Sequence, residues 1–172
     1  PGDDEPRKLQ NLRAGLRGVY REWYILDTSP PAVYVFRPDS ACSYYTTLIG
    51  RDSQTEIVDI ARDLRGQVYA LDRRAKVIIR YSADGSPLGN VVDRDDEWNR
   101  PEAIDIDALG NIYYLDRNLK EVIVYDRDGN QLHRMGPNIG SIELKSPRDI
   151  AVDGSGRIYI ADKDLPGVIV IG

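Results

Sequence analysis

Four aspartates recur along the chain at a nearly constant interval and are the first residues to consider for chemistry. They are separated by 45, 44 and 46 residues: Asp27, Asp72, Asp116 and Asp162. Carboxylates bind divalent cations or act as general acids and bases. A catalytic residue is needed only once, however, whereas an aspartate at a strand end can accept bonds from backbone amides in every repeat. We therefore expect these four side chains to be structural.

The segment 93–100 is the strongest candidate for a binding site. It contains four carboxylates and Trp98. Tryptophan and arginine are the residues that most often anchor protein interfaces, and this pattern predicts an exposed Trp98. A second interpretation stays open, in which the segment is a solvated acidic loop and Trp98 packs against the edge of a sheet.

Residues able to perform nucleophilic or acid–base catalysis are scarce. The chain has one histidine, His133, and one cysteine, Cys42. Neither lies in a catalytic motif, and no phosphate-binding glycine loop or Gly-x-Ser-x-Gly sequence occurs. The segment 126–130 faintly resembles a calcium loop but lacks its length and its closing glutamate, so we interpret it as a hairpin turn. We assign no catalytic residue, no metal ligand and no cofactor.

Composition limits the class of protein. The chain has 172 residues, with 23 basic and 28 acidic side chains and a net charge of −5. This acidic balance argues against a nucleic-acid partner, and the longest apolar run, residues 32–36, is far too short to span a membrane. The chain begins with Pro1, so we expect a processed product or part of a longer protein, in which residues 1–8 form a charged tail.

A repeat of about 45 residues positions the aspartates. A tyrosine stands three residues before each of them, an apolar run follows, and a glycine precedes three of them by six residues: Gly66, Gly110 and Gly156. The runs are short, β-branched and aromatic, which indicates strands. Each repeat is predicted to contain four antiparallel strands, with a hairpin at Asp84-Gly85 or Asp128-Gly129 between the last two. The sequence therefore predicts an all-β propeller built from four-stranded blades.

We place the four blades at residues 9–50, 51–92, 93–138 and 139–172, with the last lacking its outer strand. A blade face of roughly 300 Å² left in water would forfeit about 4–8 kcal/mol. We therefore expect the ring to be completed by further blades, by a second chain or by a partner.

In a propeller, the loops after the second strand and the connections between blades open on the same rim. A protein or peptide partner would meet this rim, and the candidate binding residues are Arg51, Arg73, Arg74, Asp93, Glu97, Trp98, Arg100, Arg117 and Lys163.

The repeat resembles the NHL repeat. Residues 147–162 are the closest copy and residues 101–116 the second, and the resemblance covers nearly all of residues 56–172 but is weaker over 9–50. It implies a β-propeller, most often six-bladed, of which this chain would supply the C-terminal four blades. Because bacterial propellers of this style are often exported, it also implies a periplasmic or extracellular location.

The function indicated is a non-catalytic protein-interaction or ligand-binding scaffold that uses the loop-bearing rim. The alternative is a metal-dependent lactonase or ester hydrolase, because some propellers of this appearance hold a divalent cation on their axis. In that case the candidate residues are Glu102, Asp59, Asp105 and Asp149. RNA binding ranks last, because the basic residues Arg73, Arg74 and Lys76 are offset by the acidic segment 93–97.

Overall fold

The computed structural model describes residues 11–18, 22–28, 31–38, 43–49 and 55–172, and for 37–38 and 43–49 it describes the backbone alone. All regular elements in these ranges are strands. No helix that is long and apolar enough to cross a membrane occurs in this part of the chain. The all-β prediction is confirmed.

The strands form successive antiparallel sheets in which each strand pairs with the next one along the chain. The first sheet contains β1 (Leu12–Arg17), β2 (Trp23–Thr28), β3 (Pro31–Pro38) and β4 (Ser43–Ile49). The second contains β5 (Ile57–Arg62), β6 (Val68–Asp72), β7 (Val77–Tyr81) and β8 (Pro87–Val92). The third contains β9 (Pro101–Ile106), β10 (Ile112–Asp116), β11 (Glu121–Tyr125) and β12 (Gln131–Met135).

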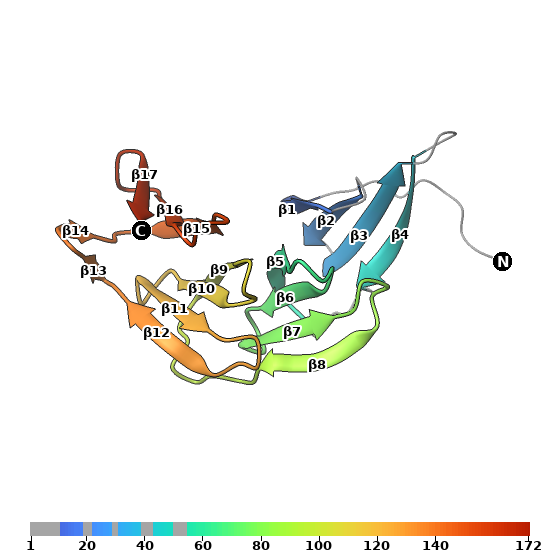
Figure 1. Cartoon of the computed structure of the whole chain (residues 1–172), viewed down its shortest axis with the longest axis horizontal. Helices are drawn as coiled ribbons and strands as arrows, with labels where there is room; N and C mark the ends of the chain where they lie inside the picture. Colours follow the sequence, from blue (N-terminus) through green and yellow to red (C-terminus); the bar gives the residue numbers. More distant parts are fainter. Residues whose placement is uncertain (1–10, 19–21, 29–30, 39–42, 50–54) are drawn as a thin grey trace.

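The fourth sheet contains three strands in the described residues: β15 (Pro147–Val152), β16 (Ile158–Asp162) and β17 (Val168–Ile171). A two-stranded ribbon, β13 (Asn138–Ile139) and β14 (Ile142–Glu143), lies in the connection before it. The sheets follow one another around an open arc, with β1, β5, β9 and β15 on its inner side (Figure 1). This is the predicted arrangement of propeller blades.

The turn glycines lie where the sequence pattern put them. Gly110 has a φ of +90°, which side chains other than glycine rarely adopt, and its amide donates to the carbonyl of Asp107 at 3.1 Å. Gly129, in the last hairpin of the third sheet, has a φ of +88°. A Cβ at Gly129 would also lie only 1.8 Å from the carbonyl oxygen of Val91, so this glycine allows the second and third sheets to approach closely.

The recurrent aspartates are structural, as predicted. Asp116 has no exposed surface, and its Oδ2 accepts bonds from the amides of Asn99 and Arg100 at 2.8 and 2.9 Å. Its Oδ1 accepts bonds from the amides of Asn118 and Leu119, both at 3.0 Å. One buried carboxylate thus joins the connection that enters the sheet to the loop that follows its second strand.

The same contact recurs in the other sheets. Asp72 accepts bonds from the amides of Glu56, Arg74 and Ala75. Asp162 accepts bonds from three amides as well: Lys145, Ser146 and Asp164. Since both kinds of loop meet at one carboxylate, they lie at the same end of each sheet, which is the rim expected from the sequence.

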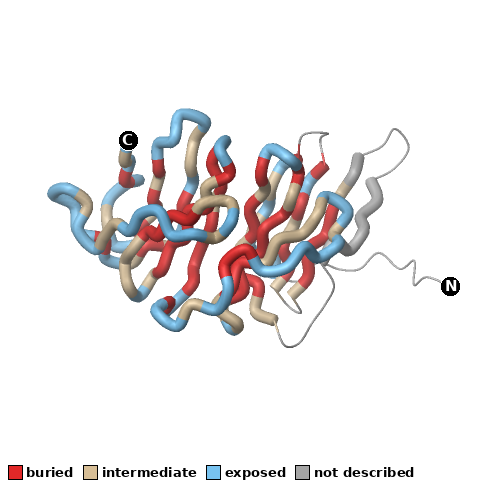
Figure 2. Tube along the Cα trace, turned by 60° about the horizontal axis from the view of Figure 1, so that its bottom comes forward, coloured by how far each residue is buried: buried red, intermediate tan, exposed pale blue. Residues whose placement is uncertain are grey.

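The core lies between the sheets rather than within one layer. Three apolar clusters fill the three successive interfaces, and buried residues run through the middle of the strands (Figure 2). The exception is the outer face of the fourth sheet. Val168 and Val170 are 58% and 55% exposed, whereas Val122 and Val124, at the same register in the third sheet, are 0% and 3% exposed.

We predict that valines at one register differ sharply in what they contribute to stability. Val122→Ala removes two buried methyl groups and should lower the free energy of unfolding by about 2 kcal/mol. Val168→Ala removes exposed groups and should change it by less than about 0.5 kcal/mol. Urea unfolding of both variants checks this, and equal losses would contradict the view that only one of the two faces is covered.

Candidate functional site

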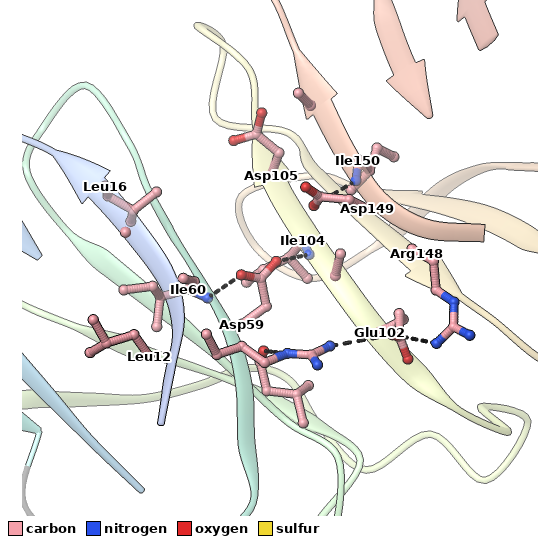
Figure 3. Close-up of a pocket in the computed structure, with 16 residues that line it drawn as sticks. Leu12, Leu16, Asp59, Ile60, Glu102, Ile104, Asp105, Arg148, Asp149 and Ile150 are labelled. Carbon is pink, nitrogen blue, oxygen red and sulfur yellow. Dashed lines mark hydrogen bonds and ion pairs between the residues drawn. The ribbon is translucent and has the colours of Figure 1, made fainter. Parts of the chain in front are cut away.

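The inner strands of the four sheets line a half-open cavity of about 710 Å³ (Figure 3). Its lining comes from β1, β5, β9 and β15, so residues more than 100 positions apart in sequence meet there. The charged residues in the lining are Arg13, Asp59, Glu102, Asp105, Arg148 and Asp149.

Glu102 is the centre of the most unusual charge arrangement in the described residues. Its side chain is only 4% exposed, and four arginines surround its carboxylate. Arg13 and Arg73 lie 3.3 Å from its two oxygens, and Arg148 and Arg100 lie at 3.7 and 3.8 Å. Such partners offset part of the cost of burying a carboxylate.

Backbone irregularity aims these side chains at one point. The pairing of β9 with β10 passes from Pro101 to Ala103 and leaves Glu102 unmatched. Arg13 is likewise unmatched in the pairing of β1 with β2, and Arg148 is unmatched in the pairing of β15 with β16. An extra residue of this kind is a β-bulge, which commonly redirects a side chain next to a functional site.

Two of the arginines are fixed further by carbonyl oxygens. The Nε of Arg13 donates to Val58 at 3.0 Å, and the Nε of Arg73 donates to Pro101 at 2.9 Å. Arg73 also pairs with Glu56 at 3.0 Å. Arg73 therefore reaches from the loop at the end of β6 across to the next inner strand.

The inner aspartates tie neighbouring sheets together. Asp59 on β5 accepts a bond from the amide of Ile104 on β9 at 2.8 Å. Asp105 on β9 accepts one from the amide of Val152 on β15 at 2.7 Å. Burial raises the pKa of Asp59 to about 7, and it also raises the pKa of Asp105. The negative charge of Asp149 raises both pKa values further.

The carboxylates proposed as metal ligands do not converge. Asp59 and Asp105 bind backbone amides of different strands, and Glu102 faces the arginines. Asp149 is exposed and accepts a bond from the amide of Ile150. In the part of the chain that the structure describes, no three histidine, cysteine, aspartate or glutamate side chains form a group that could hold a metal ion.

The structure brings only some of the predicted rim residues together. Arg73 and Arg100 join the group at Glu102, while Arg74, Arg117 and Lys163 lie on loops at the same end. Glu97 pairs instead with Arg134 on the outer strand β12 at 2.8 Å, and Asp93 accepts a bond from Asn90. Arg51 lies outside the described residues, as does Cys42.

The prediction of an exposed Trp98 is wrong. Its side chain is 0% exposed, and its ring stacks on Tyr114 with a centroid distance of 3.9 Å and an angle of 16°. Its Nε1 donates to the hydroxyl of Tyr125 at 2.8 Å. The indole ring is thus buried against an aromatic side chain, and its one hydrogen-bond donor has a partner inside the protein. This agrees with the second interpretation of the sequence, in which Trp98 packs against the edge of a sheet.

Solved structures with this fold are β-propellers. A virginiamycin B lyase from Staphylococcus aureus matches with a TM-score of 0.72 at 14% identity, over 95% of this chain and 53% of the lyase. Regucalcin, a calcium-binding protein from Agrobacterium tumefaciens, matches with a TM-score of 0.66 at 18% identity, over 87% and 52%. A putative gluconolactonase matches with a TM-score of 0.69 at 19% identity, over 92% and 57%.

The chain therefore spans about half the length of the solved structures that it matches. No family model and no curated protein matches its sequence. These likenesses establish the propeller-type fold, while the NHL repeat and the activity remain to be argued from the residues.

The half-buried Asp59 should make stability depend on pH. The unfolded chain releases this proton near pH 3.8, whereas the folded chain holds it up to about pH 7. The folded state therefore binds the extra proton between these values, and the free energy of unfolding should fall as the pH rises through them. Asp59→Asn should remove on the order of 2–4 kcal/mol of that fall.

Urea unfolding at several pH values between 4 and 8 measures this effect. Asp128→Asn, at an exposed carboxylate in a hairpin, serves as the control and should leave the pH dependence unchanged. If the difference between the parent chain and Asp59→Asn is the same at both ends of this range, the assignment to Asp59 is wrong.

Proposed function

We propose that this chain is a non-catalytic scaffold of NHL-like blades that binds a protein or peptide at its loop-bearing rim. One observation carries the proposal. A cation directly follows the buried aspartate in three consecutive sheets: Arg73, Arg117 and Lys163. Their amides donate to the preceding connections at 2.9, 3.0 and 3.0 Å, so the three cations occupy equivalent places at one end of the molecule.

The rigidity of this end supports a binding role. Each loop is held by a buried aspartate that accepts several amide bonds, so little conformational freedom is lost when a partner binds. The exposed residues Arg74 and Lys163 add positive charge to the rim. These cations favour a partner segment rich in aspartate or glutamate, whereas the exposed acidic residues Asp93, Asp96 and Glu97 of the connection before the third sheet oppose it.

The repeat pattern supports the NHL-like assignment. The tyrosine before each aspartate has the same contact in successive blades: Tyr113 donates to Asp107 at 3.3 Å and Tyr159 donates to Asp153 at 2.9 Å. The uncovered outer face of the fourth sheet supports completion of the ring by further blades or by another chain.

Selection of random peptides displayed on phage tests the binding function. We expect the selected peptides to be acidic, and we expect the double variant Arg74→Glu/Arg117→Glu to bind them at least about tenfold more weakly because of like-charge repulsion. Arg65→Glu reverses an exposed charge outside these loops and should leave binding unchanged. Peptides without acidic residues, or equal losses in both variants, would contradict the proposed face.

The alternative function is a metal-dependent lactonase or ester hydrolase. The observation that favours it is the similarity of fold to regucalcin and to a putative gluconolactonase, together with the acidic residues on the inner strands. It requires Asp149 and its neighbours Asp59 and Glu102 to give up the contacts described above and to turn toward a shared ion.

A lactone assay separates the two functions. We expect no hydrolysis of gluconolactone above the spontaneous rate when Ca²⁺ or Zn²⁺ is added, because these carboxylates are held by amides and arginines. Metal-dependent hydrolysis that is lost in Asp149→Asn would establish the enzyme instead.

A further inference from the structure

We propose that the cavity contains a separate site for the carboxylate or phosphate group of a small organic molecule. The site lies where Arg13 and Arg148 line the cavity beside Glu102. Arg73 and Arg100 do not line the cavity but lie within 4 Å of the same carboxylate, and we call the four side chains the arginine cluster. It goes beyond the proposed rim function, because the ligand meets the cavity-lining side chain of Arg148 rather than Arg74, Arg117 and Lys163. Arg73 belongs to both groups and is therefore left unchanged in both tests.

Positive charge is in excess at this point. Four guanidinium groups lie within 4 Å of one carboxylate, and the one further acidic partner among these contacts is Glu56, which pairs with Arg73. Like charges held this close repel one another, and a bound anion removes part of that repulsion.

Hydrogen-bond donors are also in excess. Each guanidinium group has five N–H donors, whereas the carboxylate of Glu102 accepts about four bonds. Arg148 and Arg100 lie 3.7 and 3.8 Å from this carboxylate, which is longer than a hydrogen bond. The Nε of Arg148 is buried and has no hydrogen-bond partner among the described residues.

A buried donor without an acceptor is costly, and an oxyanion supplies what is missing. Carboxylate and phosphate groups have the planar or paired oxygens that accept two parallel bonds from a guanidinium group. Arg148 lines the cavity and is therefore the residue that we expect to contact the ligand. Arg100 adds positive charge near Glu102 without lining the cavity, while Arg13 and Arg73 are held in place by carbonyl oxygens.

The cavity has room for the rest of such a molecule. Its volume of about 710 Å³ lies within the range of small-molecule sites. Apolar side chains from all four inner strands line it: Leu12, Leu16, Ile60, Ile104 and Ile150. The ligand is thus a small molecule with an anionic end and a partly apolar body.

The charges along the cavity determine which end of the ligand faces the arginine cluster. Asp105 is three residues beyond Glu102 on β9, or about 10 Å along the strand, and Figure 3 shows it at the opposite end of the cavity. Asp59 and Asp149 lie between them. A second anionic group would be repelled there, whereas an ammonium group would be attracted.

Three probes of similar length test this arrangement by calorimetric titration of the intact chain at pH 8, above the pKa of about 7 of Asp59, so that this carboxylate is charged. Butyrate has one carboxylate, 4-aminobutyrate adds an ammonium group at the far end, and glutarate replaces that group with a second carboxylate. We expect 4-aminobutyrate to bind most tightly and glutarate most weakly. Propyl phosphate shows whether the site prefers phosphate over carboxylate, and either preference is consistent with the shared oxyanion chemistry.

Substitutions locate the binding. Arg148→Gln should weaken binding of 4-aminobutyrate at least about tenfold, because it removes a charge-assisted pair of bonds. Arg148→Lys keeps a positive charge but loses the paired donors, and it provides a second test if Arg148→Gln fails to fold. Arg65→Gln, and the rim variant Arg74→Glu/Arg117→Glu, should bind the probe as the parent chain does.

Three results would overturn the proposal. The first is no binding of any probe at millimolar concentration. The second is an equal loss in Arg65→Gln and in a folded variant of the arginine cluster, which would show general attraction to surface charge. The third is tighter binding of glutarate than of 4-aminobutyrate. Since the rim variant is measured separately, failure of this site leaves the proposed rim function untouched, and the converse also holds.

Discussion

The buried aspartate at the end of the second strand is the contact on which the rest of the structure depends. In the third sheet, Asp116 accepts four backbone amide bonds from two loops that are about 19 residues apart in sequence. Loops have few hydrogen-bond partners of their own, so one carboxylate per sheet satisfies donors that would otherwise be lost on burial. The rim is rigid because each of these carboxylates accepts bonds from several backbone amides.

A second set of aspartates joins the sheets at the inner edge of the arc. Asp59 and Asp105 reach across to amides of the next inner strand, so the sheets are joined by hydrogen bonds as well as by apolar clusters. Burial raises the pKa of both groups, because the carboxylates sit at the crowded centre of the arc. The cavity that remains between the strands is therefore polarised, with arginines at the end that bears the loops and aspartates beyond them.

The periodic features could be predicted from the sequence and the aperiodic ones could not. The strand order, the turn at Gly110 and the structural role of Asp116 all follow from spacing, because each blade uses the same turn and the same aspartate contact at the same position. Trp98 occurs once, and its burial depends on a slot formed by Tyr114 and Tyr125 on two other strands. Nothing in its own segment indicates that slot.

The charge cluster at Glu102 was missed even though its signal is present in the sequence. Arg13, Val58, Glu102 and Arg148 are 45, 44 and 46 residues apart, the same intervals that separate the buried aspartates. This position is the bulged residue of each inner strand. The signal at this position is a difference between the repeats rather than a similarity. Three copies carry a charged residue, whereas the second copy carries Val58.

The fourth sheet lacks some of the contacts that join the other sheets to one another. Asp149 occupies the register position of Asp59, yet it is exposed and bonds the amide of its own strand. In the second sheet the equivalent carboxylate also binds an amide of the next inner strand. Val168 and Val170, on β17 of the same sheet, are uncovered as well. This face thus carries both an exposed carboxylate and exposed valines. A further blade would pair with that carboxylate and cover those valines through the same contacts that join the other sheets.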